Sequence, residues 1–199
     1  MAGLLALALS VSPAAALASE GAIGPEELKR PDPSPVKGAK ICVLGGVEGY
    51  TGPLASLVGP GIAWGVMVGT QPLNVAGGEL WYSGASNALT DPSFEGGRQV
   101  RNGAGLNVKF SLTPSRVEPY VYGGIGFSIA SYSEVPAASG YSDDFYGVVP
   151  VGAGFNFHLG TWLLGVRGEL GFLFGEQVGP AATSGAQMWN GRVELGARF

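Results

Sequence analysis

The chain has 199 residues, of which 35 are glycine and only 13% are charged, and its formal net charge is -4. This glycine content is far above the usual level of roughly 7% and disfavours a helical bundle, because glycine destabilises helix interiors. The acidic balance excludes a typical nucleic-acid-binding protein, so no nucleic acid is expected as a partner. A single Cys42 and a single His158 predict neither a metal cluster nor a disulfide, and no cofactor is expected.

The first 40 residues divide into two segments that differ from the rest of the chain. Residues 1–18, "MAGLLALALSVSPAAALA", are apolar and end in a small-x-small pattern, which predicts a secretory signal peptide. A membrane anchor is the less favoured alternative, because the run is short for a hydrocarbon core of roughly 30 Å. Residues 19–40 contain four prolines and mixed charges without periodicity, and we expect a flexible periplasmic linker there.

From residue 41 to the end, apolar and polar residues alternate with the period of two that is typical of β-strands. Each alternating segment is near the roughly nine to eleven residues that a tilted strand needs to cross a bilayer. The pattern predicts eight strands, at about 41–50, 61–70, 75–84, 99–110, 117–129, 147–158, 161–173 and 188–199.

The charged residues of these segments all fall on one phase of the alternation. Five acids and five bases share that phase, and the opposite phase is apolar. A soluble lipocalin-like barrel places its apolar phase inside, around a ligand. A membrane barrel places the apolar phase outside, against lipid. The alternation by itself leaves both arrangements open.

Three further features favour the membrane barrel. The polar phase is rich in glycine, which a crowded interior explains better than a solvated surface. The apolar phase carries aromatic residues near the segment ends, where interfacial girdles lie. The links alternate between short and long, as in barrels with short periplasmic turns and longer extracellular loops, and both termini then lie on the periplasmic side.

Four stretches of the predicted barrel resemble a known family. "RVEPYVYGGIGFS", "VPVGAGFNF", "LLGVRGELGF" and "RVELGARF" are similar to small OmpA/OmpX-type outer-membrane β-barrel domains, and the resemblance covers residues 41–199. It implies an all-β fold, an eight-stranded antiparallel up-and-down transmembrane barrel in the outer membrane. The end of the chain resembles the signal by which the outer-membrane assembly machinery accepts such proteins, and its residues are Val193, Leu195, Ala197 and Phe199.

An eight-stranded barrel has an interior just wide enough for side chains to fill it. Charges inside it must be paired, so we predict a lumen closed by an ion-pair network. The candidate residues are Glu48, Glu79, Arg101, Lys109, Glu118, Arg167, Glu169, Arg192 and Glu194. A monomer with a structural or surface-interaction role is expected, in which the extracellular loops contact any partner. A narrow ion channel governed by the same charges is the alternative.

Catalysis is not expected. Some small outer-membrane barrels act on lipids through a histidine beside a serine, but His158 lies at a predicted short turn without a neighbouring serine. We interpret it as an interfacial polar residue. The glycines of "GGIGFS" lack the crossover helix and acidic partner of a dinucleotide site. The adjacent Asp143 and Asp144 are interpreted as solvated loop residues rather than a cation site.

Overall fold

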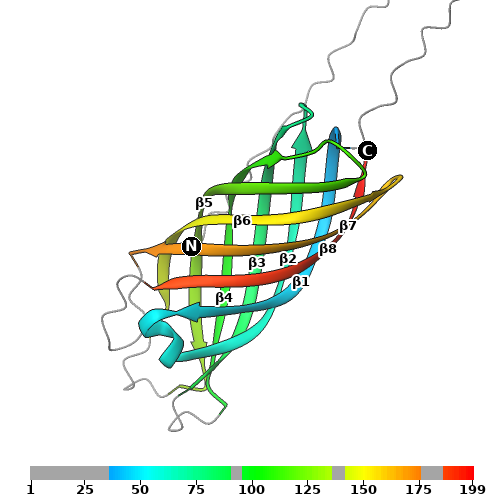
Figure 1. Ribbon diagram of the computed structural model, residues 1–199. Helices are drawn as coiled ribbons and strands as arrows, with labels where there is room; N and C mark the ends of the chain where they lie inside the picture. Colours follow the sequence, from blue (N-terminus) through cyan, green and yellow to red (C-terminus); the bar gives the residue numbers. More distant parts are fainter. Residues whose placement is uncertain (1–35, 91–95, 136–141, 176–185) are drawn as a thin grey trace, which may run out of the picture. The chain divides into compact units, whose positions relative to one another are not determined.

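The computed structural model describes residues 36–90, 96–135, 142–175 and 186–199. The predicted signal peptide and residues 19–35 of the predicted linker lie outside these residues. No helix in the described part of the chain is long and apolar enough to cross a membrane. The elements are β1 (Gly38–Thr51), the 3-10 helix η1 (Gly52–Ser56), β2 (Val58–Gln71), β3 (Ala76–Leu89), β4 (Arg98–Ser111), β5 (Val117–Ser133), β6 (Asp144–Leu159), β7 (Trp162–Phe174) and β8 (Gln187–Arg198) (Figure 1).

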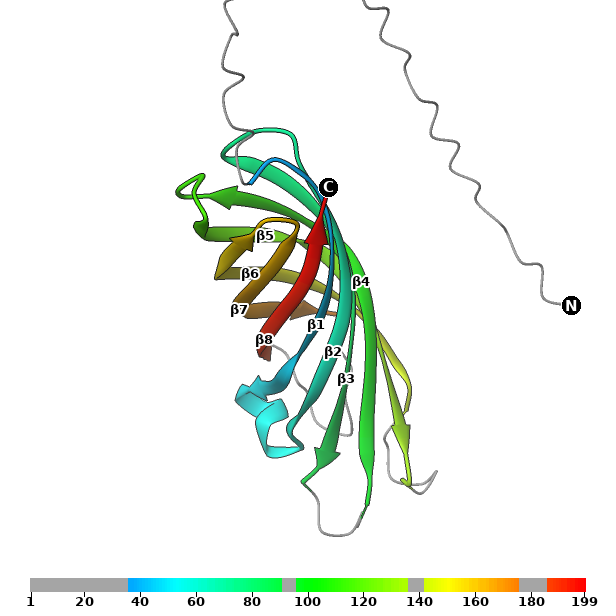
Figure 2. The same cartoon turned by 90° about the vertical axis from the view of Figure 1, so that its right-hand side faces the viewer.

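The strands form one closed antiparallel barrel in which each strand pairs with the next along the chain. The barrel closes where β8 pairs with β1, in a register that runs from Lys40 opposite Arg198 to Thr51 opposite Gln187. Figure 2 shows these two strands side by side. The predicted all-β, eight-stranded up-and-down barrel is confirmed, and each strand includes most or all of a predicted segment.

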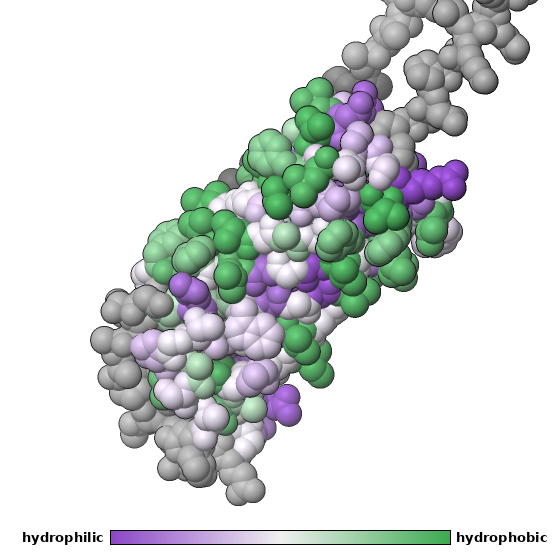
Figure 3. Space-filling view, in the orientation of Figure 1, coloured by the Kyte–Doolittle hydropathy of each residue, from purple (hydrophilic) through white to green (hydrophobic). Residues whose placement is uncertain are grey.

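The two faces of the wall differ in the way that the alternation predicts. Large apolar side chains point outward; Ile62 is 70% exposed and Leu106 is 59% exposed. Figure 3 shows apolar side chains spread over one side of the barrel wall. Most charged side chains of the strands point inward and are buried, Glu48 and Arg101 completely. This orientation is the reverse of the one that a soluble ligand-binding barrel requires.

An apolar cluster gathers at the end of the barrel from which the long loops leave. It includes Leu54 of η1, which is fully buried although it lies in a link that the alternation predicts as a loop. The residues around it come from the long-loop ends of the strands and include Tyr50, Val58, Leu89, Val148 and Met188. We call this group the apolar cap. It packs apolar side chains above the charged part of the lumen.

Candidate functional site in the barrel lumen

The deepest ion pair of the lumen joins β4 to β1 across the barrel. Arg101 donates from Nε to Oε1 of Glu48 at 2.6 Å and from its terminal nitrogen to Oε2 at 2.5 Å. Both side chains are fully buried, and this two-point geometry is the strongest that arginine and a carboxylate make. Arg192 of β8 adds a weaker contact to the same carboxylate, at 3.3 Å. The hydroxyls of Ser83 and Ser128 accept from Arg101.

A second group of ion pairs connects β1, β3, β7 and β8. Glu79 accepts from Lys40 at 2.7 Å through one oxygen and from Arg167 at 3.0 Å through the other. Arg167 also forms an ion pair with Glu194. The hydroxyl of Tyr120 donates to Glu194 at 3.1 Å. Arginine therefore bridges two acids, and neither carboxylate is left as an isolated buried charge.

A third group surrounds Glu118 of β5, which is fully buried near the short-turn end. Both carboxylate oxygens are engaged, the first by an ammonium, a hydroxyl and an amide and the second by an amide and an imidazole. The partners are Lys109, Ser111, Gln71, Asn156 and His158. One acid of β5 thus contacts side chains from three other strands, β2, β4 and β6.

The structure brings eight of the nine candidate residues into ion pairs, namely Glu48, Glu79, Arg101, Lys109, Glu118, Arg167, Arg192 and Glu194. Glu169 differs, because no ion pair joins it to another described residue. It accepts hydrogen bonds from the Tyr122 hydroxyl at 2.9 Å and the Asn190 amide at 2.8 Å. That these contacts close the lumen remains a prediction.

Two members of the ion pairs in the lumen, Lys40 and His158, are not among the predicted residues. Lys40 was placed in the linker, but β1 begins at Gly38, so Lys40 lies inside the barrel and is 8% exposed. Lys40 is at the same phase of the alternation as Cys42 and Glu48. This pattern is hard to recognise because the residues before it have the composition of a linker. The interpretation of His158 as an interfacial residue is wrong, because its ring is buried at 2.9 Å from Glu118. His158 shares the polar phase of β6 with Asn156.

The hydrogen bonds of these lumen side chains favour a structural role for them over a catalytic one. Ser111 and His158 meet at the same carboxylate, but the serine hydroxyl donates to Glu118. A serine nucleophile needs its hydroxyl hydrogen bonded to the base instead. Within the described ranges, no three His, Cys, Asp or Glu side chains are placed to hold a metal ion. Cys42 packs with Leu44 and other apolar side chains inside the barrel.

The predicted assembly signal lies on the outer face of β8. Val193 and Leu195 are each 52% exposed, and the Phe199 side chain is 75% exposed. The backbone of Phe199 exchanges two hydrogen bonds with Ala39, at 2.9 Å and 3.0 Å. The ring therefore adds little packing to the barrel, while the backbone of the last residue helps to close it.

Comparison with known proteins identifies the fold. No family model matches the chain, and no curated protein matches it either. Neisserial surface protein A has a solved structure that matches with a TM-score of 0.62 and 15% identity, covering 82% of this chain and 98% of that one. Ail, the attachment invasion locus protein of Yersinia pestis, matches with a TM-score of 0.56 and 12% identity, covering 82% and 99%.

The N-terminal β-barrel domain of Pseudomonas aeruginosa OprF matches with a TM-score of 0.52 and 14% identity, covering 82% of this chain and 98% of that domain. These structures are eight-stranded outer-membrane barrels. The structural matches show a shared fold, as the resemblance to OmpA/OmpX-type barrels implies. At such low sequence identity, the role of this chain has to be argued from its own residues.

Proposed function

We propose that this chain is an integral outer-membrane β-barrel protein with a structural or cell-surface interaction role and a lumen closed by its ion pairs. One observation carries the proposal, namely the opposition between an exposed apolar wall and a buried, charged interior. Lipid is the solvent that suits such a wall. The short turns and both termini would face the periplasm, and the longer loops would face outward, where they are free to contact a partner.

Two layers of side chains support a closed lumen over the alternative of a narrow channel. The apolar cap gathers at the long-loop end, and the pair of Arg101 and Glu48 joins opposite walls below it. Ion conduction requires a polar path that is continuous from one end to the other. The packed apolar side chains of the cap oppose such a path.

The proposed location in the outer membrane is tested by producing the full chain in cells and separating their inner and outer membranes. We expect the protein in the outer-membrane fraction, soluble only with detergent, because the apolar wall is exposed along the barrel. A closed barrel that resists detergent at room temperature should also migrate differently on a gel before and after boiling. Recovery in a soluble fraction without detergent, with unchanged migration after boiling, would contradict the proposal.

The closed lumen is tested by reconstituting the purified protein in planar bilayers. We expect no discrete conductance steps, because the apolar cap and the ion pairs fill the interior. Regular steps from the unaltered protein, reduced when Glu169 is changed to Gln, would instead establish the narrow channel.

The role of the terminal residue is tested by Phe199→Ala. The backbone bonds to Ala39 remain in this variant, so refolding into detergent micelles in vitro should be unchanged. In cells, we expect the amount in the outer membrane to fall several-fold, because the exposed ring would be read by the assembly machinery. Leu112→Ala, which also removes an exposed apolar side chain at the short-turn end, serves as the control. Equal membrane levels of Phe199→Ala and the unaltered protein would argue against an assembly signal.

A further inference from the structure

The short-turn mouth of the barrel is lined mainly by polar side chains. A pocket in this mouth is lined by residues of seven strands, and its large polar side chains are those of Lys40, Gln71, Glu79, Lys109, His158 and Arg198. Among the described residues of the lining, Val36 and Leu163 supply the large apolar side chains. At this end the strands therefore present charged and amide groups to the mouth, in contrast to the apolar cap at the other end.

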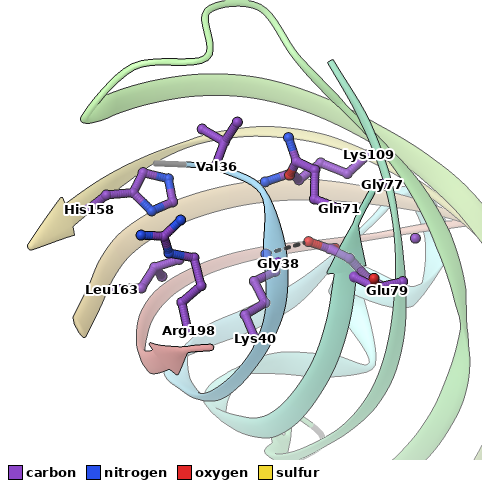
Figure 4. Close-up of a pocket in the computed structure, with 12 residues that line it drawn as sticks. Val36, Gly38, Lys40, Gln71, Gly77, Glu79, Lys109, His158, Leu163 and Arg198 are labelled. Carbon is purple, nitrogen blue, oxygen red and sulfur yellow. Dashed lines mark hydrogen bonds and ion pairs between the residues drawn. The ribbon is translucent and has the colours of Figure 1, made fainter. Parts of the chain in front are cut away.

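Val36 covers these polar groups although it precedes the first strand. It lines the pocket and is only 3% exposed, and Lys40 in the same lining is 8% exposed. Figure 4 shows Val36 between His158 and Gln71 at the mouth. The ion pair of Lys40 and Glu79 lies below them in this view. An apolar residue from outside the sheet is thus packed into the mouth of the barrel.

The backbone at Gly38 allows the chain to turn back over the mouth. Gly38 is the first residue of β1, and its φ is +123°. Residues with a Cβ rarely adopt this conformation, whereas glycine does so at little cost. A Cβ at position 38 would also lie 2.7 Å from the backbone oxygen of Phe199. The turn between Val36 and the strand therefore depends on glycine.

Residues 36–38 are held against the rim by the end of the chain. The guanidinium of Arg198 donates to the backbone oxygen of Lys37 at 3.0 Å. The backbone of Ala39 exchanges two hydrogen bonds with that of Phe199, which fixes the strand directly after these residues. The position of Val36 over the mouth thus depends on contacts between β1 and the end of β8.

We propose that residues 36–38 form a hinged lid on the short-turn mouth of the lumen. Val36 is the side chain that closes the mouth, and Gly38 is the hinge. The hydrogen bond from Arg198 to Lys37 holds the lid down. This inference rests on the proposed function, because it assigns the seal of the closed lumen at the periplasmic end. The lid and the apolar cap then cover the ion pairs from both ends of the barrel.

The lid shields two ion pairs from the solvent at this end. Lys40 pairs with Glu79 and Lys109 pairs with Glu118, each at 2.7 Å, and both lysines line the mouth. Salt screens pairs that meet the solvent much more strongly than buried pairs. With the lid closed, the stability that these pairs contribute is nearly independent of salt. With the lid open, dissolved ions reach the pairs and weaken them.

The position of the lid is measured by cysteine labelling of the purified protein in detergent micelles. Cys42, the only cysteine of the chain, is first changed to Ala. Val36→Cys and Lys37→Cys are then compared for their rates of reaction with a water-soluble methanethiosulfonate. Buried thiols are unreactive, so we expect Val36→Cys to react at least about 20-fold more slowly than the exposed Lys37→Cys. Adding Gly38→Ala should remove most of this protection, because the turn at the hinge is then strained.

Another glycine at the same end of the barrel provides the control. Gly160 also has a positive φ, of +67°, and a Cβ there would meet no atom within 4 Å. Gly160→Ala strains a short turn away from the lid, so Val36→Cys should stay protected in this background. Equal rates for Val36→Cys and Lys37→Cys, or protection that survives Gly38→Ala, would overturn the lid. Such a result without conductance in planar bilayers would reject the lid alone and leave the closed lumen standing.

The seal is measured separately with Val36→Ser, which keeps the hinge and replaces the apolar cover by a smaller polar side chain. Raising NaCl from about 0.1 M to about 1 M shortens the screening length from about 10 Å to about 3 Å. We expect this change to lower the urea midpoint of Val36→Ser by at least about 0.3 M relative to the unaltered chain. Val75→Ser, at an exposed valine of the same end, should respond like the unaltered chain. An equal salt response of all three proteins would contradict the seal, and this measurement decides the matter if Gly38→Ala does not fold.

Discussion

Arg101→Met is expected to lower the free energy of unfolding by about 3–5 kcal/mol, because it leaves a fully buried carboxylate without its main partner. Glu48 would then retain Arg192 at 3.3 Å as its remaining ion-pair partner among the described residues. Methionine fills much of the arginine volume, so little of the loss should come from an empty space. The cost arises because Glu48, which is 0% exposed, loses its two-point partner and keeps only the weaker contact to Arg192.

Urea unfolding of the purified protein in detergent, followed by tryptophan fluorescence, measures this loss. Glu48→Gln combined with Arg101→Met removes both charges of the pair, and most of the lost stability should return. Arg98→Met, at the exposed start of β4, is the control and should change the free energy of unfolding by no more than about 0.5 kcal/mol. A double variant as unstable as Arg101→Met would show that the charge of Glu48 is not the cause.

The fold could be predicted from the sequence because alternate residues of a strand point to opposite sides of the sheet. The charges of each segment fall on one phase, and the outer phase is apolar, so the inward and outward residues of β4 and β8 could be assigned without coordinates. The alternation of short and long links then indicated consecutive antiparallel pairing. These features involve residues within one strand or in two consecutive strands, so a single sequence is enough to recognise them.

The partners inside the lumen could not be predicted in the same way. Arg101 lies on β4 and Glu48 on β1, two strands that do not pair with each other, and their meeting depends on the stagger around the whole barrel. Stagger has no signature in the alternation of one strand. Glu118 and His158 lie on β5 and β6, which do pair, and their contact depends on a register that places Glu118 opposite Asn156. Lys40 escapes prediction for a different reason, because the composition changes after residue 40 although the first strand already begins at Gly38.

Gly46→Ala is expected to destabilise the barrel by about 3 kcal/mol or more, although it adds a single methyl group. Gly46 faces inward on β1, opposite Arg192 of β8. A Cβ at this position would collide with the backbone oxygen of Gly191 and lie 2.8 Å from the Cα of Arg192. Backbone atoms of a paired strand cannot rotate away as a flexible side chain can. The substitution therefore forces apart the two strands that close the barrel.

The neighbouring residue provides a matched control for this effect. Gly45 faces outward on the same strand, and a Cβ there would meet no atom within 4 Å. Gly45→Ala should be neutral or stabilising by up to about 1 kcal/mol, because alanine reduces the freedom of the unfolded chain. Heat-dependent gel migration and urea unfolding in detergent would compare the two variants. Equal losses of stability in the two variants would mean that strand propensity sets the cost of these substitutions. A loss confined to Gly46→Ala would show that the pairing of β1 with β8 depends on close backbone contact inside the lumen.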